Sequence, residues 1–221
     1  MRKYLLSQVR SELEPGTVFE PAHWCHAETA AVDVFPWFMS GLKQRTEVRL
    51  VYDKDALHLL FEAQDIHSYA GKRELNGRVY LDSCVEFFAS PWPDDTPDYF
   101  NCEINCCGAI HFGFGPDRYN RKLISPALAE DILVLSTIAG DAKKEFQDDS
   151  GWKVYVRLPR KTLSVLCGRS VGFSGMWRGN FHRCGGRTEP QFACWNPIDS
   201  PNPDYHRPEQ FGELMFNLDI A

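Results

Sequence analysis

Two segments of the sequence carry acidic and amide side chains at alternate positions among apolar residues. In residues 80–88, Glu86 stands between apolar neighbours, and in residues 99–106, Glu103 and Asn105 alternate with apolar ones. A period of two places alternate side chains on opposite faces of a β-strand. If the two strands pair, Glu86 and Glu103 lie on one polar face of a sheet.

A later segment adds cationic and amide groups to this pattern. Arg178, Asn180 and His182 alternate along one strand, so the combined face would present carboxylate, amide, guanidinium and imidazole groups. Planar polar groups beside aromatic rings suit sugars, because the polar groups hydrogen-bond to vicinal hydroxyls and the rings stack on the C–H faces of the sugar. The alternative is a solvated sheet face whose polar groups pair with one another.

Composition and charge exclude several other classes of partner. The 221 residues include 24 Lys and Arg against 30 Asp and Glu, which gives a net charge of −6. This acidic balance argues against nucleic acid or an anionic membrane surface as partner, since both are bound through clustered basic residues. No stretch approaches the ~20 apolar residues of a membrane span.

The N-terminal residues and the cysteines together predict a compartment. Residues 1–10 begin like a secretory signal, but they break off before an apolar core of ~7–15 residues, so we expect a cytoplasmic protein. The eight cysteines are then reduced thiols, and Cys84, Cys102 and Cys106 are expected to fill the core. Their even number leaves a disulfide framework open.

The elements that must position these residues are mostly strands. Alternation predicts strands over residues 46–52, 57–63, 84–89, 99–106, 109–114, 132–138, 152–158, 171–181 and 213–218. Short helices are predicted over 126–130 and 159–166. Because no linker or repeat divides the chain, we expect one domain over residues 1–221, an all-β, two-sheet antiparallel β-sandwich with a few short helices.

Five ordered motifs carry a resemblance to a known family. They are Asp-Ser-Cys-Val-Glu-Phe-Phe at 82–88, Glu-Ile-Asn at 103–105 followed by Gly108, Trp-Arg-Gly-Asn-Phe-His-Arg-Cys at 177–184, Trp-Asn-Pro-Ile at 195–198 and His-Arg-Pro-Glu-Gln-Phe-Gly at 206–212. Over about residues 20–219 the chain resembles the carbohydrate-binding module family 9-like proteins. Five motifs in the same order are more specific than any one of them.

The resemblance implies a function and a set of site residues. It implies a DOMON-like β-sandwich, often attached to xylanases, which grips sugar ends between two Trp rings beside a Glu and an Asn. In this sequence the Glu matches Glu86, the first Trp matches Tyr80, and the two Asn positions match Asn105 and Asn180. The position of the second Trp holds Arg183, so the two-Trp clamp is changed here.

The resemblance also implies structural calcium, without identifying its ligands. Oxygen-rich loops at Asp94-Asp95, at Asp53 and Asp55, and between Asp199 and Asp204 are candidates, and each also fits an ordinary turn.

We therefore expect non-catalytic binding of a mono- or oligosaccharide. Tyr80 is the expected stacking ring, Glu86, Asn105 and Asn180 are the expected hydrogen-bonding residues, and Glu103, Arg178 and Arg183 form a second tier.

Three alternatives remain open at this stage. A glycoside hydrolase could use Glu86 and Glu103 as its paired carboxylates. A scaffold without ligand would be indicated if Tyr80 and Arg183 were buried against each other. Zinc could be held by residues 23–26, 102–107 or 182–184, although none of these segments has the paired spacing of a structural site.

Overall fold

The computed structural model describes residues 1–10, 13–138, 145 and 150–220, and these residues are mostly in β-strands. The strands are β1 (Lys3–Gln8), β2 (Ala30–Ala31), β3 (Thr46–Tyr52), β4 (Ala56–Ala63), β5 (Cys84–Ser90), β6 (Tyr99–Asn105), β7 (Ile110–Gly115), β8 (Lys122–Leu123), β9 (Leu133–Ser136), β10 (Trp152–Pro159), β11 (Met176–Cys184), β12 (Ala193–Cys194) and β13 (Gly212–Ile220). The helices are α1 (Pro126–Ala129) and α2 (Arg160–Cys167), with the 3₁₀ turns η1 (Pro21–Trp24), η2 (Val79–Leu81) and η3 (Pro208–Gln210). The predicted all-β class with short helices is confirmed.

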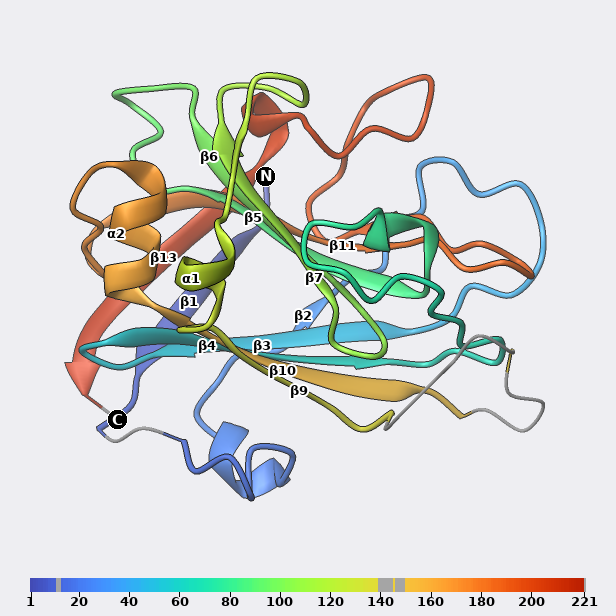
Figure 1. Ribbon diagram of the computed structural model, residues 1–221, viewed down its shortest axis with the longest axis horizontal. Coiled ribbons are helices and arrows are strands. Elements are labelled where there is room, and N and C mark those ends of the chain that lie inside the picture. The colour runs from blue at the N-terminus through green and yellow to red at the C-terminus, as the bar shows by residue number, and fades with distance from the viewer. Residues whose placement is uncertain (11–12, 139–144, 146–149, 221) are drawn as a thin grey trace.

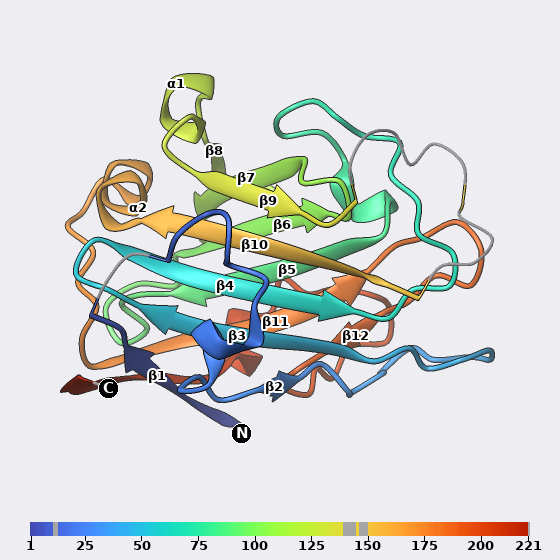
Figure 2. The same cartoon turned by 90° about the horizontal axis from the view of Figure 1, so that it is seen from below.

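Hydrogen bonds join these strands into one large sheet. Its order is β8-β7-β6-β5-β11-β13-β1-β3-β4-β10-β9, while β12 pairs with β11 and β2 with β3. The two ends of this order approach each other, since the Ser136 hydroxyl of β9 donates to the carbonyl of Cys106, directly after β6, so the sheet is strongly curled (Figures 1 and 2). None of the helices in the described segments is long and apolar enough to cross a membrane.

The first strand of the chain lies in the middle of the sheet. β1 runs parallel to both of its neighbours, β13 and β3. The other pairs of the sheet are antiparallel, as predicted, so β1 is the exception that the alternation pattern did not indicate. Tyr4 and Leu6 from this strand are buried, and the Tyr4 hydroxyl donates to the carbonyl of Glu28 at 2.6 Å.

The core fills the inside of the curl. Phe181 of β11 has its ring centroid 6.3 Å from that of Phe61 on β4 and 5.3 Å from that of Phe87 on β5. Since β4 and β11 are separated by three strands in the sheet order, their contact is made across the curl rather than along it. Trp177 is also buried in this core, as its place in an alternating strand predicted.

Glycines account for two local boundaries. β11 begins at Met176, not at residue 171 as the alternation predicted, because Gly175 takes a left-handed conformation (φ +71°) that interrupts the extended chain. α2 ends at Gly168 (φ 67°), whose backbone amide bonds back to the last turn, as predicted.

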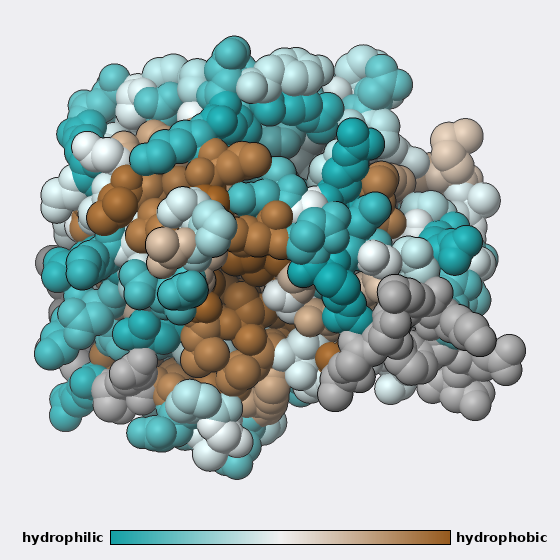
Figure 3. Space-filling view, viewed as in Figure 1, coloured by the Kyte–Doolittle hydropathy of each residue, from teal (hydrophilic) through white to brown (hydrophobic). Residues whose placement is uncertain are grey.

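On the side shown in Figure 3, apolar residues gather in the middle of the face and hydrophilic residues surround them.

The contact across the curl should dominate stability. We expect Phe181→Ala to lower the free energy of unfolding by about 3–5 kcal/mol, because it removes a ring packed against both sides of the core. Val165→Ala, at an exposed position of α2, should change it by less than about 1 kcal/mol. Urea unfolding followed by circular dichroism measures both, and equal losses would contradict the assignment of Phe181 to the centre of the core.

Candidate functional site

A pocket of about 540 Å³ opens on the face of β5, β6 and β11 that points away from the core. Residues from these strands, from β7 and η2, and from the segments before β8 and on both sides of β12 line it. Its lining comprises Tyr80, Glu86, Phe88, Asn101, Glu103, His111, Arg118, Tyr119, Arg121, Cys184, Phe192, Pro203, Tyr205 and His206. Polar and aromatic groups therefore meet in one concave site.

The register of three strands builds the floor of this pocket. Glu86 of β5 is directly opposite Glu103 of β6 on one side and His182 of β11 on the other. Both carboxyls are nearly enclosed, with 2% of Glu86 and 4% of Glu103 exposed. The structure thus brings the two glutamates together on one face, as the alternation of their strands predicted.

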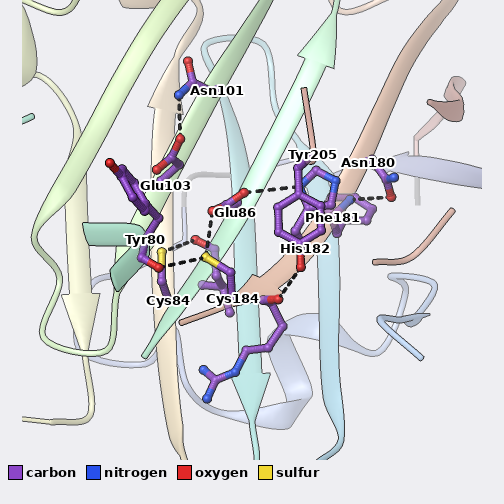
Figure 4. Close-up of polar contacts among 12 residues, drawn as sticks. Tyr80, Cys84, Glu86, Asn101, Glu103, Asn180, Phe181, His182, Cys184 and Tyr205 are labelled. Carbon is purple, nitrogen blue, oxygen red and sulfur yellow. Dashed lines mark hydrogen bonds and ion pairs between the residues drawn. The ribbon is translucent and has the colours of Figure 1, made fainter. Parts of the chain in front are cut away.

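Each carboxyl has one hydrogen-bonded oxygen and one oxygen without a hydrogen-bond partner among the described residues. The Cys184 thiol donates to Glu86 Oε1 at 2.9 Å, and Asn101 Nδ2 donates to Glu103 Oε1 at 2.8 Å (Figure 4). The Oε2 atoms of Glu86 and Glu103 find no hydrogen-bond partner within the described residues. Buried polar atoms are normally paired, so these two oxygens lack a partner that a ligand could supply.

Burial disfavours the charged forms of the groups on the floor. It raises the pKa of Glu86 well above the usual value, with further upward contributions from Cys184 and Glu103, and it also raises the pKa of Glu103. Burial lowers the pKa of His182 far below that of a free imidazole, so its 3.4 Å contact with Glu86 Oε2 is not an ion pair. The pKa of His206 falls to about 3, first through burial and then through Arg121.

Aromatic side chains form the exposed walls. Tyr80 lies on η2 with 40% of its surface exposed, and Tyr119, in the loop between β7 and β8, is 87% exposed. Gly185 fixes the approach of η2 to β11, because a Cβ there would lie 1.9 Å from the Asp82 carbonyl oxygen and 2.6 Å from that of Tyr80. With φ at +72°, this position also favours glycine.

Arg121 is a structural member of the lining. Its Nη2 donates to the Tyr99 carbonyl and its Nε to Asn101 Oδ1, both at 2.8 Å, and its guanidinium lies over the Tyr99 ring. The Tyr99 hydroxyl in turn contacts His206 Nδ1 at 2.7 Å. These bonds hold the loop that carries Tyr119.

The two predicted asparagines lie outside the pocket lining. Asn180 Nδ2 donates to the carbonyl of Asn196 and its Oδ1 accepts from the Asn196 amide, which ties β11 to the next segment. Asn105 Nδ2 donates to Lys72 O and Asp82 Oδ2, while its Oδ1 accepts from the Ala109 amide. Both side chains are buried and hold backbone segments together.

The two predicted arginines are placed differently again. Arg183 is 1% exposed, pairs with Asp65 and lies over the ring of Trp152, on the opposite side of β11 from Asn180 and His182. Arg178 donates to the Met1 sulfur at the other end of β11. Neither arginine lines the pocket.

Several lining residues were not predicted. Arg118 and Tyr119 lie in a loop, where no periodicity identifies facing side chains, and His111 belongs to β7, whose neighbour in the sheet the sequence does not specify. His206 begins the motif at residues 206–212, and this motif was the one feature of the sequence that could have indicated it as a site residue.

The acidic loops considered for calcium do not converge in the described residues. Asp53 accepts from the amides of Asp55 and Ala56, which makes it a turn, and Asp204 pairs with Arg118 and Arg207. Asp95 pairs with Arg169. The one group of three potential metal ligands in this part of the chain is Cys84, Glu86 and Cys184.

Comparison with known proteins identifies the family. The model of carbohydrate-binding family 9 matches residues 22–216, most of the chain. The chain belongs to carbohydrate-binding family 9. No curated protein sequence matches it.

Three solved structures share its fold. A crystal structure of a putative carbohydrate-binding protein from Bacteroides uniformis is 27% identical, with a TM-score of 0.87, and the match covers 98% of this chain and 99% of that one. A family 9 module from Caldicellulosiruptor kristjanssonii, solved with glucose, is 13% identical with a TM-score of 0.64 and covers 98% and 96%. The same module with cellotriose gives the same identity and TM-score.

The buried carboxyls should lower stability at high pH. A pKa raised by folding means that the stabilisation is complete below the unfolded pKa of ~4.3 and is lost as pH rises through the folded value. We expect Glu103→Gln, which stays neutral, to raise the free energy of unfolding at pH 8 by at least about 1 kcal/mol, a shift of ~2–4 °C in Tm.

Thermal unfolding at pH 8 and pH 4.5 checks this, and the gain should shrink at the lower pH. The exposed Glu130→Gln is the matched control and should leave Tm unchanged at both. A loss of stability for Glu103→Gln at pH 8 would contradict the neutral floor.

Proposed function

We propose that this protein binds a mono- or oligosaccharide, without cleaving it, in the pocket floored by Glu86 and Glu103. The observation that carries the proposal is the buried carboxyl pair, each with one unpaired oxygen, beside exposed tyrosine rings in a member of carbohydrate-binding family 9. The solved complexes of a family 9 module with glucose and cellotriose support it.

The chemistry of the floor suits neutral hydroxyls. A protonated carboxyl donates one hydrogen bond and accepts others, so Glu86 and Glu103 can each bond a hydroxyl without the cost of a buried charge. Tyr80 and Tyr119 offer ring faces on which the C–H face of a sugar can stack. The volume lies within the ~300–1,000 Å³ typical of small-molecule sites.

The proposed roles differ among the seven residues expected from the sequence. Tyr80, Glu86 and Glu103 contact the sugar, whereas Asn105, Asn180 and Arg183 support the strands and loops around the pocket, and Arg178 has no part in it. Arg183 stands at the sequence position of the second Trp of the clamp and supplies no ring to the pocket. Tyr119 takes the place of that ring. We further propose that the two halves of the curled sheet act as the two layers of a sandwich.

The carboxyl environments favour binding over hydrolysis. A glycoside hydrolase needs one carboxyl protonated and the other ionised, which requires environments that move the two pKa values apart. Here burial is the largest influence on both carboxyls and raises the pKa of each, so it favours neither of them as the ionised partner. The condition for a scaffold without ligand is also not met, because Tyr80 is partly exposed and Arg183 pairs with Asp65.

Calorimetric titration with a panel that includes glucose and cellotriose tests the site. We expect Glu86→Ala to weaken binding about 10- to 100-fold, since it removes a buried hydrogen-bonding group worth ~1–3 kcal/mol. Tyr80→Ala and Tyr119→Ala should each weaken it through loss of stacking.

Arg178→Ala is the matched control, because Arg178 lies on β11 outside the pocket, and its affinity should equal that of the wild type. Equal affinities for Glu86→Ala and wild type, or no heat with any sugar, would remove the proposed site. Release of reducing sugar by the wild type would favour the hydrolase instead.

A further inference from the structure

Two cysteines meet beside the floor of the pocket. Cys84 of β5 and Cys184 of β11 are directly opposite each other in the strand register, and both are buried free thiols. Glu86 follows on the same face of β5. One ligand atom from each of Cys84, Glu86 and Cys184 can be chosen so that all three lie within 4.8 Å of one another.

Unpartnered polar atoms beside this cluster point to a missing ligand. Glu86 Oε2 has no hydrogen-bond partner among the described residues, and neither ring nitrogen of His182 has one there. His182 is fully buried, stacks on Tyr205 with a centroid distance of 4.1 Å, and lies 3.4 Å from Glu86 Oε2. Such groups usually mark an ion or water in the working protein.

The donor set distinguishes between metals. Two thiols and one carboxyl suit zinc, which takes sulfur, nitrogen and oxygen ligands, whereas calcium prefers six to eight oxygens. Around a tetrahedral ion with bonds of ~2.0–2.3 Å, these ligands lie roughly 3.5–3.8 Å apart. The 2.9 Å contact between Cys184 and Glu86 then has to lengthen by only about 0.6–0.9 Å.

We propose that Cys84, Glu86 and Cys184 bind a zinc ion at the base of the pocket, with His182 beside it as an outer partner of Glu86. Three protein ligands leave one position of a tetrahedral ion for water. The ion enters through the pocket, which Glu86 and Cys184 line. On binding, the two thiols and the carboxyl each release a proton to solvent, and the ion's two positive charges offset two of the three negative charges left behind.

This site goes beyond the proposed function, and it shares Glu86 with it: Glu86 is a hydrogen-bonding group of the pocket in the metal-free protein and a carboxylate ligand when zinc is bound. It also differs from the three zinc patterns of the sequence. Those patterns used neighbouring residues, whereas Cys84 and Cys184 are brought together only by the pairing of β5 with β11.

The experiment uses reduced full-length protein stripped of metal. Cys25→Ser is introduced into every sample, because Cys25 is exposed and stands beside His23 and His26, which could hold a surface ion. Zinc affinity is measured by competition with a chromophoric chelator, stoichiometry by native mass spectrometry, and thiolate ligation by the charge-transfer absorption of the cobalt(II) form. Thermal unfolding establishes which variants are folded.

We expect one zinc per chain in the Cys25→Ser parent, with a thiolate-to-cobalt band. Cys184→Ala and Cys84→Ala should each weaken zinc binding about 100-fold or more, and Glu86→Gln should weaken it at least about tenfold. Calcium should not compete. The proposal would be overturned if the folded parent bound no zinc, or if folded Cys184→Ala bound zinc with the affinity of the parent. Metal binding without a thiolate-to-cobalt band would overturn it as well. If both alanine variants fail to fold, the band in the parent decides.

Failure of this site and failure of the sugar site are separable. Sugar titration of the stripped parent tests the proposed function alone, and the chelator competition in the absence of sugar tests zinc alone.

Discussion

Glu86 can lie at the floor of the pocket only while β5 keeps its alignment with β6 on one side and β11 on the other. A slip of one residue would turn Glu86 towards the core and Phe87 towards the pocket, because side chains alternate along a strand. Phe87 is held against Phe181 in the core, so hydrophobic packing on one face fixes which polar groups appear on the other. The pocket is in this sense a product of the core behind it.

The same burial that positions the carboxyls determines what they can recognise. An ionised carboxylate in this site would be a strong acceptor only, and it would be costly to enclose. Neutral carboxyls beside neutral imidazoles instead match ligands whose own groups both donate and accept, and hydroxyls do so. The unpaired Oε2 atoms of Glu86 and Glu103 lower the stability of the free protein. Functional sites commonly cost stability in this way.

Strand alternation predicted the part of the site that is regular. It placed Glu86 and Glu103 on one face, and it gave the bounds of most strands within a few residues, because one buried face imposes the period. Arg183, one position from His182, points the other way in the structure, although the resemblance set it where a ring was expected.

The remaining features depend on contacts that the sequence pattern does not encode. Asn105 and Asn180 lie on the expected strands, yet backbone segments from elsewhere cover both of them. Tyr119 is presented by a loop whose conformation Arg121 fixes through long-range bonds. The sequence pattern did not predict the six-residue strand β1. Its partners are β13 and β3, and parallel pairing leaves no local turn that would indicate a strand.

That position of β1 has a consequence for how the chain reaches its native state. The strand lies between β13 and β3, so the sheet stays open along one side of β1 until Gly212–Ile220 has been synthesised. Contacts this distant in sequence raise the contact order and slow folding. During synthesis on the ribosome, the edge of β1 that pairs with β13 would remain unpaired until those residues emerge, which is a period of exposed strand edge that favours aggregation.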